Sequence, residues 1–213
     1  YKDVRDINKK DLTGIDQIVY LAAISNDPMG NTFKKITQEI NYKSAIKIAK
    51  LAKKNNVKKF IFASSCSIYG FTKNLTKSEL SKLNPLTTYA KSKVLSEKKL
   101  KLISDNNFNV VCLRFATACG YSTNLRLDLV LNDFVASAIV SRELQVLSDG
   151  SPWRPLIHIK DMARAINWAI EEKKINKFIS LNAGSNNMNY QIRDLAYNVA
   201  KLIKGTKVYI NTR

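Results

Sequence analysis

The chain alternates between short apolar runs and amphipathic helical patterns, and this alternation limits the folds open to it. The apolar runs cover residues 16–23, 57–64 and 109–115, with helical patterns over 32–55 and 88–105 between them. Runs of this length suit strands that are buried on both faces of a parallel sheet. Their order predicts right-handed βαβ crossovers and therefore an α/β fold, a Rossmann-type doubly wound parallel sheet.

The regular alternation ends near Gly120, and a mixed pattern follows. We expect helices over 128–142, 160–173 and 190–203, and extended segments over 144–147, 155–159, 177–182 and around Val208. Turn-forming residues between positions 25 and 30 indicate a loop. We predict two domains, a Rossmann-like domain (1–118 and 156–186) and part of a small mixed α/β lobe (119–155 and 187–213).

The chain is strongly basic. It has 35 Lys and Arg residues against 17 Asp and Glu, a formal net charge of +18. Such an excess suggests nucleic acid or an anionic substrate as a partner. The lysines are scattered along the helical patterns, and aromatic residues are not interleaved with them as a stacking platform requires. We interpret most of this charge as a solvated surface, and keep a nucleic-acid face as the alternative.

Cysteine and histidine usage narrows the class of protein further. Cys66, Cys112 and Cys119 lack CxxC spacing, which indicates buried small side chains in a reducing compartment. His158 is the single histidine and cannot build a metal site alone, so we expect no metal. We also expect neither a membrane span nor a leader. Because the sequence begins with Tyr1, we expect an internal piece of a longer protein.

One short motif carries possible chemistry. Tyr89 and Lys93 are four residues apart, just after Pro85 and at the start of a helical pattern. On a helix this spacing puts both side chains on one face. A nearby ammonium lowers the pKa of a tyrosine from about 10, so that the phenol can act as a general base. The alternative is a solvated helix face in a lysine-rich chain.

Further candidates follow the predicted strands, because ligands of open parallel sheets bind beyond the carboxyl ends of the strands. The residues there are mostly small or polar: Ala22, Ala23, Ser25, Ser64, Ser65, Cys66, Ser67, Ala116, Thr117, Ala118, Asn182 and Gly184. They suit a flat cofactor that lies across the strand ends. Polar loops also follow strands in any α/β protein, so these candidates gain weight only together with Tyr89 and Lys93.

In their order and spacing, the motifs resemble the extended short-chain dehydrogenase/reductase family, in its branch of NAD-dependent nucleotide-sugar epimerases and dehydratases. The resemblance covers nearly the whole chain. It rests on Asp3-Val4-Arg5-Asp6, Leu21-Ala22-Ala23, Asn41, Ser64-Ser65-Cys66-Ser67-Ile68-Tyr69-Gly70, Tyr89 with Lys93, Leu113-Arg114-Phe115 and Trp153-Arg154-Pro155-Leu156-Ile157-His158-Ile159.

The resemblance implies NAD as cofactor, with NADP not excluded, and a nucleotide-diphosphate sugar as substrate. Tyr89 would be the general base, Lys93 would lower its pKa and bond the nicotinamide ribose, and Ser65 would orient the substrate oxygen. The implied cofactor-binding residues are Asp3, Val4, Leu21, Ala22, Ala23, Asn41, Ser64, Tyr89, Lys93, Ala116 and Ala118.

The candidate substrate-binding residues are Ser25, Ser65, Ser67, Thr117, Asn132 and Arg154. The guanidinium of Arg154 is expected to clamp the diphosphate, for which its fork of donors is well matched, and a surface ion pair is the alternative. For Ser25, the alternative is a loop serine that caps a turn.

The sequence also departs from the family pattern. The Gly-x-x-Gly-x-x-Gly turn is absent and is expected upstream, so residues 1–213 alone should bind the cofactor poorly and be inactive. Cys66-Ser67 stands where the 4,6-dehydratase branch has Asp-Glu, which argues against dehydration. Thr117 replaces an asparagine, so sugar contacts should be altered, and Pro155 in place of an aspartate is another local change.

We therefore predict a cytoplasmic NAD(P)-dependent nucleotide-sugar epimerase or reductase, with hydride transfer at a sugar carbon. The resemblance also implies a homodimer. The alternatives are a nucleotide-sugar 4,6-dehydratase and a non-catalytic, dehydrogenase-like protein that binds RNA. The retained Ser65, Tyr89 and Lys93 count against the last.

Overall fold

The structure is a computed structural model that describes residues 2–71 and 76–211. Two compact units divide it. The first contains the described residues up to Phe115 together with Ala163–Ala183, and the second contains Ala116–Met162 and the described residues from Gly184 onward.

These units differ in part from the predicted domains. The sequence analysis placed 116–118, 156–162 and 184–186 in the Rossmann-like domain, whereas the structure groups all three segments with the second unit. For the first two segments, the reason is that β4 (Thr117–Cys119) pairs with β6 (Trp153–His158), which joins them to each other. The assignment of the two units to cofactor and substrate stays a prediction.

A four-stranded parallel sheet in the order β1-β2-β3-β7 forms the centre of the first unit. Its strands are β1 (Gln17–Tyr20), β2 (Lys59–Ser65), β3 (Asn109–Phe115) and β7 (Phe178–Ala183). Phe60, Phe62 and Val110 are fully buried in it. Strands that are covered on both faces require such apolar side chains. The predicted parallel α/β sheet is therefore confirmed.

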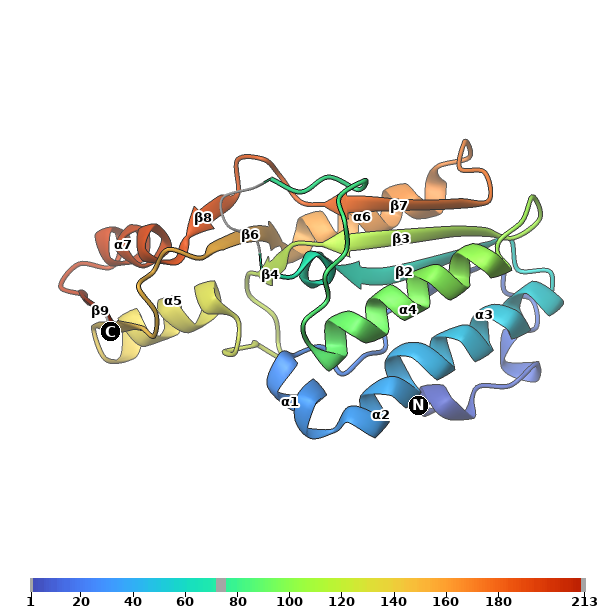
Figure 1. The fold of residues 1–213 in the computed structure, drawn as a ribbon, viewed down its shortest axis with the longest axis horizontal. Helices are drawn as coiled ribbons and strands as arrows, with labels where there is room; N and C mark the ends of the chain where they lie inside the picture. The colour runs from blue at the N-terminus through green and yellow to red at the C-terminus, as the bar shows by residue number, and fades with distance from the viewer. Residues whose placement is uncertain (1, 72–75, 212–213) are drawn as a thin grey trace. The chain divides into compact units, whose positions relative to one another are not determined.

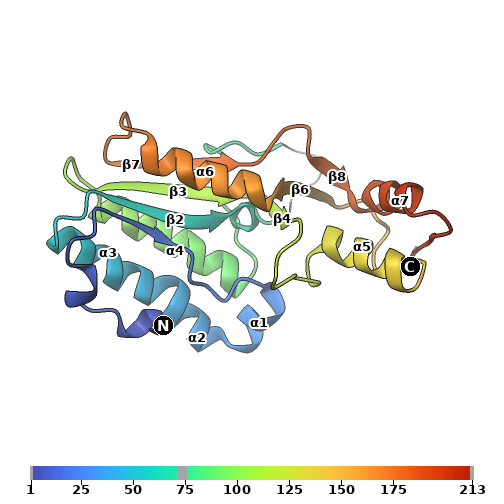
Figure 2. The same cartoon turned by 180° about the vertical axis from the view of Figure 1, so that it is seen from behind.

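Helices cover both faces of this sheet. The helices α3 (Ala45–Lys54) and α4 (Thr88–Ile103) lie on one face, and α6 (Ile159–Glu171) lies on the other (Figures 1 and 2). Lys59 of β2 ties α6 to the sheet, because its ammonium donates to the carbonyls of Ala169, Ile170 and Glu172 at 2.8–2.9 Å. These carbonyls lie at the end of α6, where helix geometry leaves them without helical partners.

The segment between β1 and β2 contains more structure than the sequence predicted. The expected loop at 25–30 is wrong in part, because α1 (Asp27–Thr32) forms there. Asn26 caps it by accepting from the amide of Met29 at 2.8 Å, and Pro28 suits its first turn. The helix predicted over 32–55 is divided into α2 (Lys34–Gln38), a π-helical turn η3 (Glu39–Ser44) and α3.

Short 3-10 turns complete the first unit: η1 (Val4–Asp6), η2 (Lys10–Leu12) and η4 (Cys66–Tyr69). No disulfide joins the three cysteines, all of which lie in the described residues. Cys112 and Cys119 are buried as expected, but Cys66 is only half-buried because it sits in η4 after the end of β2.

The second unit has a mixed sheet in the order β4-β6-β8 and a parallel pair of β5 with β9. Its elements are α5 (Val130–Val140), β5 (Glu143–Val146), β8 (Asn189–Gln191), α7 (Ile192–Leu202) and β9 (Lys207–Ile210). Phe134, Leu144 and Leu156 are central to its core. Neither β4 nor β8 was predicted, because three-residue strands carry too little periodicity. Within the described ranges, every helix is too short or too polar to cross a lipid bilayer.

Candidate active site

The strands of the first unit end together at one edge, which is where the candidate residues gather. Ser65 at the end of β2 pairs in register with Phe115 of β3, and Phe115 pairs with Ala183 of β7. The helix α4 follows β2 and η4 in the chain. Thr87 caps it by accepting from the amide of Ala90 at 3.1 Å, which leaves Tyr89 in its first turn.

Lys93 is the most constrained of the predicted catalytic residues. Lys93 is only 2% exposed, and its Nζ donates to the carbonyl oxygen of Ala63 at 2.6 Å. Nζ also lies 4.7 Å from the ring centre of Phe62 and 5.5 Å from that of Tyr89. Burial lowers the pKa of Lys93 to about 8. The ammonium is therefore mostly charged at neutral pH and lies next to the phenol ring.

Ser65, the last residue of β2, and Ser67 of η4 differ in the hydrogen bonds of their hydroxyls. Ser65 Oγ accepts from the amide of Ser67 at 3.2 Å and so caps η4. Ser67 Oγ is buried and has no hydrogen-bond partner among the residues that the structure describes. A buried hydroxyl without a partner is costly, since its interaction with water is lost without replacement. A ligand oxygen or a water at the strand ends would satisfy it.

Ser64 turns away from this edge into the interior. It is 3% exposed, and its hydroxyl donates to Glu97 Oε1 at 2.5 Å. Only its backbone remains for the predicted contact with a cofactor.

Asn41 positions the chain that follows β1. It is fully buried in the π-helical turn, accepts from the amide of Ile24 at 2.8 Å and donates to the carbonyl of Ile24 at 3.0 Å. It also donates to Ser92 Oγ of α4 at 3.2 Å. The amide of Asn41 therefore connects the loop after β1 to the helix that carries Tyr89. A π-helical turn at such a point is typical of functional sites.

The remaining candidates of the first unit are more exposed. Ala22 and Ala23 are half-buried after β1, and Leu21 and Ser25 are exposed. Asp3 is exposed and caps η1, where hydrogen bonds from Arg5 hold the pKa of its carboxyl at about 2. Val4 is half-buried against the core of the first unit.

The candidates of the second unit lie around β4 and β6. Ala116 is buried, Thr117 and Ala118 are half-buried, and Arg154 is exposed, with Nη1 donating to the carbonyl of Trp153 at 3.0 Å. Asn132 accepts from the amide of Gly120 at 3.2 Å and donates to the carbonyl of Arg126 at 3.0 Å. Its amide therefore fixes the loop before α5, a role that the sequence analysis did not predict.

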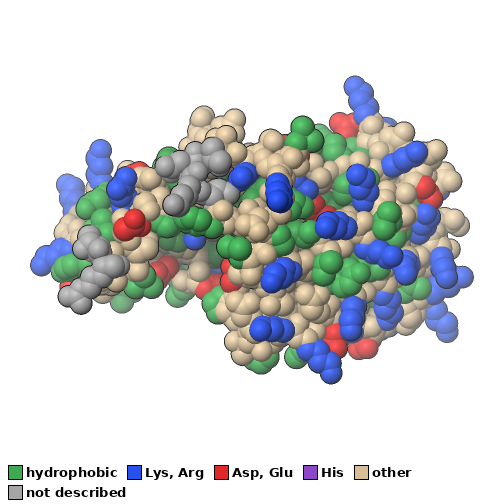
Figure 3. All heavy atoms as spheres, in the orientation of Figure 1, with side chains coloured by type: hydrophobic (Ala, Val, Ile, Leu, Met, Phe, Trp, Pro, Cys, Tyr) green, Lys and Arg blue, Asp and Glu red, His purple; other side chains and the backbone are tan. Residues whose placement is uncertain are grey.

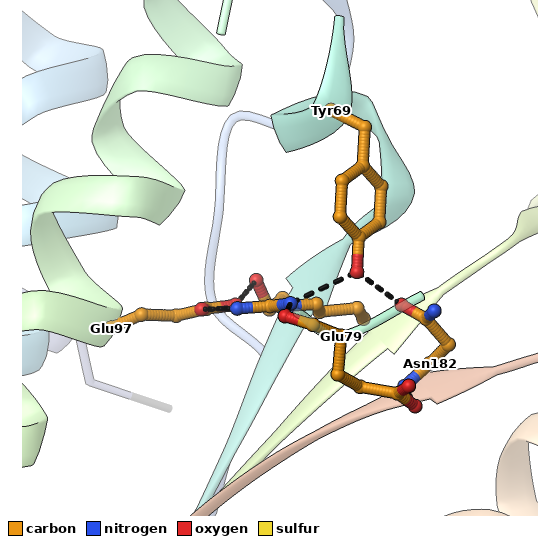
Figure 4. A network of polar contacts seen from close by, with 6 residues as sticks. Tyr69, Glu79, Glu97 and Asn182 are labelled. Atoms are coloured by element: carbon orange, nitrogen blue, oxygen red, sulfur yellow. Dashed lines mark hydrogen bonds and ion pairs between the residues drawn. The ribbon is translucent and has the colours of Figure 1, made fainter. Parts of the chain in front are cut away.

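A polar network with a buried ion pair at its centre, near the strand ends, was also missed (Figure 4). Glu97 of α4 and Arg114 of β3 form an ion pair with a shortest distance of 2.7 Å, and their side chains are 5% and 6% exposed. Arg114 also donates to Tyr69 Oη at 2.9 Å, and Tyr69 donates to Asn182 Oδ1 at 2.6 Å. Two signals were available in the sequence, an arginine within an apolar strand and a glutamate four residues after Lys93.

Basic side chains are spread over the face that carries α3 and α4, as Figure 3 shows. A groove of about 900 Å³ lies there, and six of its ten lining residues are lysines: Lys43, Lys47, Lys50, Lys53, Lys54 and Lys99. Two of these lysines have partners, since Lys53 pairs with Asp105 and Lys47 donates to the carbonyl of Arg5. Among the described residues, no group of His, Cys, Asp and Glu side chains is arranged to hold a metal ion.

Comparison with known proteins defines the class. The sequence profile of the NAD dependent epimerase/dehydratase family matches residues 2–184, and the chain belongs to this family. NAD is therefore the cofactor of the class. The resemblance seen in the motifs is confirmed.

Individual relatives agree with this class. The chain is 28% identical over 158 residues to an uncharacterized UDP-glucose epimerase of Bacillus subtilis, covering 73% of this chain and 49% of that protein. It is 25% identical over 191 residues to a putative UDP-glucose 4-epimerase of Methanocaldococcus jannaschii, covering 85% of this chain and 61% of that protein. The chain thus spans about half to three fifths of the length of these relatives.

Solved structures share the fold. The UDP-glucuronic acid 4-epimerase of Bacillus cereus, in complex with UDP-glucuronic acid and NAD, superposes with a TM-score of 0.86 at 24% identity. The match covers 99% of this chain and 67% of that one. The UDP-N-acetylglucosamine 4-epimerase of Methanobrevibacter ruminantium gives the same TM-score at 24% identity, with 100% of this chain and 69% of that chain covered.

Proposed function

We propose that the protein containing this chain is an NAD-dependent nucleotide-sugar epimerase or reductase that uses Tyr89 as its general base. One observation carries the proposal: the buried Lys93 is held by the carbonyl of Ala63, near the end of β2, with its ammonium 5.5 Å from the centre of the Tyr89 ring. Lys59, which donates to three carbonyls at the end of α6, is also buried, but Lys93 differs in that its ammonium lies beside the ring of a tyrosine. A positive charge next to a phenol stabilises the phenolate and so prepares Tyr89 to take a proton.

The residues at the strand ends fit the cofactor of the family. The buried hydroxyl of Ser67 offers a donor and an acceptor, and Ala22 and Ala23, which follow the neighbouring strand β1, have small side chains. Ala116 and Ala118 are the corresponding small residues after β3. When bound, NAD supplies hydride transfer to and from a sugar carbon.

The side chains of this chain then have separate roles. The Tyr89 phenolate accepts the proton of a sugar hydroxyl, and Ser65 hydrogen-bonds the same oxygen and orients it. Lys93 has three hydrogens, of which Ala63 takes one, so two remain for a ribose hydroxyl and a water. Arg154, exposed in the second unit, is proposed to hold the diphosphate through its guanidinium fork.

The test compares single variants of the full-length protein, with UDP-glucose and UDP-galactose as probe substrates. Tyr89→Phe and Lys93→Met should each lower turnover about 100- to 10,000-fold, the usual contribution of acid–base catalysis, while circular dichroism stays unchanged. Tyr197→Phe, an exposed tyrosine of α7, is the matched control and should keep its rate. Near-normal turnover in both site variants would contradict the proposal.

The dehydratase alternative has its own measurement. Since Cys66 and Ser67 replace the acidic pair expected of a 4,6-dehydratase, the product should have the mass of the substrate, or of a form two hydrogens heavier or lighter. A product lighter by one water, detected by mass spectrometry, would establish dehydration instead.

The basic groove between α3 and α4 is the specific observation in favour of the RNA-binding alternative. RNA binding that weakens steeply with salt, together with full retention of binding in Tyr89→Phe and no sugar turnover in the unsubstituted protein, would establish that alternative. A homodimer and a cytoplasmic location remain parts of the proposal, testable by light scattering and by fractionation.

A further inference from the structure

Three residues of this polar network occupy one row across the sheet. Ser64 of β2 is in register with Arg114 of β3, and Arg114 is in register with Asn182 of β7. Each comes one residue before the last residue of its strand. Because side chains in register point to the same face, the row lies on one face of the sheet. The bond from Ser64 to Glu97 shows that this is the face that α4 covers.

Glu97 is the point where α4 meets this row. Its two carboxylate oxygens accept from Ser64 Oγ at 2.5 Å, from Arg114 Nε at 3.1 and 3.2 Å and from Arg114 Nη2 at 2.7 Å. Such forked pairing between a guanidinium and a carboxylate fixes both position and orientation. Glu97 lies on α4, four residues after Lys93 and eight after Tyr89, so all three share one side of the helix.

We propose that Glu97 is a positioning residue for Tyr89 and Lys93, because its contacts with Ser64 and Arg114 fix the place of α4 along the sheet. The inference rests on the proposed function of that pair. Two successive turns of α4 are held by two successive residues of β2: Lys93 by the carbonyl of Ala63, and Glu97 by the hydroxyl of Ser64. A slide of the helix would break both contacts together.

The position of Tyr89 follows from these two contacts. Each helical residue rises about 1.5 Å, so Tyr89 lies about 6 Å beyond Lys93 toward the start of α4. A displacement of about 1 Å in a catalytic group can cost about 100-fold in rate. The network therefore determines where the phenol oxygen stands relative to Ser65 at the end of β2.

Glu97 also acts on the charge of Lys93. The titratable and charged groups around Lys93 are Tyr89 and Glu97 on α4, and Cys112 and Arg114 on β3. Burial lowers the pKa of Lys93, while Cys112 and Glu97 oppose that effect. The thiol of Cys112 stays neutral, since burial raises its pKa well above the usual value. Glu97 is thus the negative charge that favours a charged Lys93, and it also neutralises Arg114.

The far side of the network holds Arg114 in place. Nη1 of Arg114 donates to Tyr69 Oη at 2.9 Å and to the carbonyl of Glu79 at 3.1 Å. Asn182 Oδ1 accepts from Tyr69, and the backbone N–H of Asn182 donates to Glu79 Oε1 at 2.8 Å. Figure 4 shows Tyr69, Glu79 and Asn182 converging on this point from three segments of the chain. With its donors engaged on both sides, Arg114 cannot turn away from Glu97.

The experiment measures the titration of Lys93 directly by 13C NMR of labelled lysine side chains in the full-length protein, with the resonance assigned by its loss in Lys93→Met. In Glu97→Gln, we expect the Lys93 pKa to fall by at least about half a unit, because a neighbouring charge is removed and Arg114 is left unpaired. Turnover of UDP-glucose should fall about 100-fold. Glu97→Asp keeps the charge and should keep the pKa. Glu171→Gln removes an exposed carboxylate and should change neither value.

A second variant keeps the test possible if Glu97→Gln does not fold. Glu97→Leu with Arg114→Met removes both charges together, so no lone charge is buried. The same loss of turnover is expected, whereas the Lys93 pKa should fall by less than in Glu97→Gln, because the positive charge of Arg114 is removed as well. A folded Glu97→Gln protein with an unmoved Lys93 titration and turnover within threefold of normal would overturn the inference. The titration needs neither cofactor nor sugar, so it is read separately from the proposed function, which fails only if Tyr89→Phe and Lys93→Met remain active.

Discussion

The neighbouring helices α3 and α4 cover the same face of one sheet, yet they bury different kinds of side chain. The buried residues of α3 are all apolar: Ala45, Ile46, Ile48, Ala49 and Ala52. On α4 they include four polar or charged side chains: Ser92, Lys93, Ser96 and Glu97. Burying a charge is costly unless it is paired and hydrogen-bonded. The contrast indicates that α3 serves the core, whereas α4 maintains a site.

Each buried polar side chain of α4 forms at least one hydrogen bond with a neighbouring element. Ser96 Oγ donates to the carbonyl of Asn41 at 3.0 Å, and Asn41 in turn donates to Ser92. Lys93 and Glu97 are held by β2 and β3. A satisfied polar network makes a position more specific than apolar packing does, since a small displacement breaks several bonds at once. This difference between α3 and α4 can be tested.

The largest effect on stability should come from breaking the ion pair of α4. Glu97→Leu leaves the guanidinium of Arg114 buried without a counter-charge, which should reduce the free energy of unfolding by about 3–5 kcal/mol in urea titrations. Adding Arg114→Met should restore most of that loss. A single variant as stable as the unsubstituted protein would show that the network contributes little.

Lys93 of α4 should make the stability of the protein depend on pH. Its pKa in the folded protein is about 8, below the ordinary 10.5, so between these pH values the unfolded chain holds more protons and stability rises with pH. The expected gain is up to about 3 kcal/mol across this window. The raised pKa values of Cys112 and Tyr20 act in the opposite direction. The measurement is therefore the difference from Lys93→Met, and equal slopes in both proteins would contradict the prediction.

The smallest effect is expected in α3. Ile48→Val removes one buried methyl group and should reduce the free energy of unfolding by about 0.5–1.5 kcal/mol. Turnover should stay the same, because Ile48 packs in the core and none of its neighbours in α3 belongs to the proposed site. Thermal unfolding and a turnover assay on the same sample would check both. A large loss of turnover would remove the distinction between the two helices.

Much of the fold follows from local pattern. The runs at 57–64 and 109–115 form β2 and β3 because continuous apolar stretches of this length are stable only between two helical layers. The pair Tyr89–Lys93 is found by spacing alone, since both residues belong to one helix. The helix α1 was missed because its cap, Asn26, and its proline at 28 are also common in turns.

The polar network around Glu97 could not be predicted from local sequence pattern. Its members are far apart in the chain: Ser64 and Glu97 are separated by 33 residues, and Tyr69 and Asn182 by 113. Arg114 in a predicted strand looks like an exception to an apolar pattern until the register puts Ser64 and Asn182 beside it. Likewise, the resemblance implied only a cofactor contact for Asn41, and its hydrogen bonds to Ile24 and Ser92 became visible only in the structure.

The sequence by itself determined the alternation of strands and helices, the class of fold and the spacing of Tyr89 and Lys93, because these depend on residues that are close in the chain. Only the tertiary structure decided which polar side chains are buried and how they are paired. Burial and pairing depend on strand register and on the place of α4 along the sheet. For Lys93 that difference is decisive, since the same lysine on a solvated helix would keep an ordinary pKa, whereas burial lowers it to about 8 beside Tyr89.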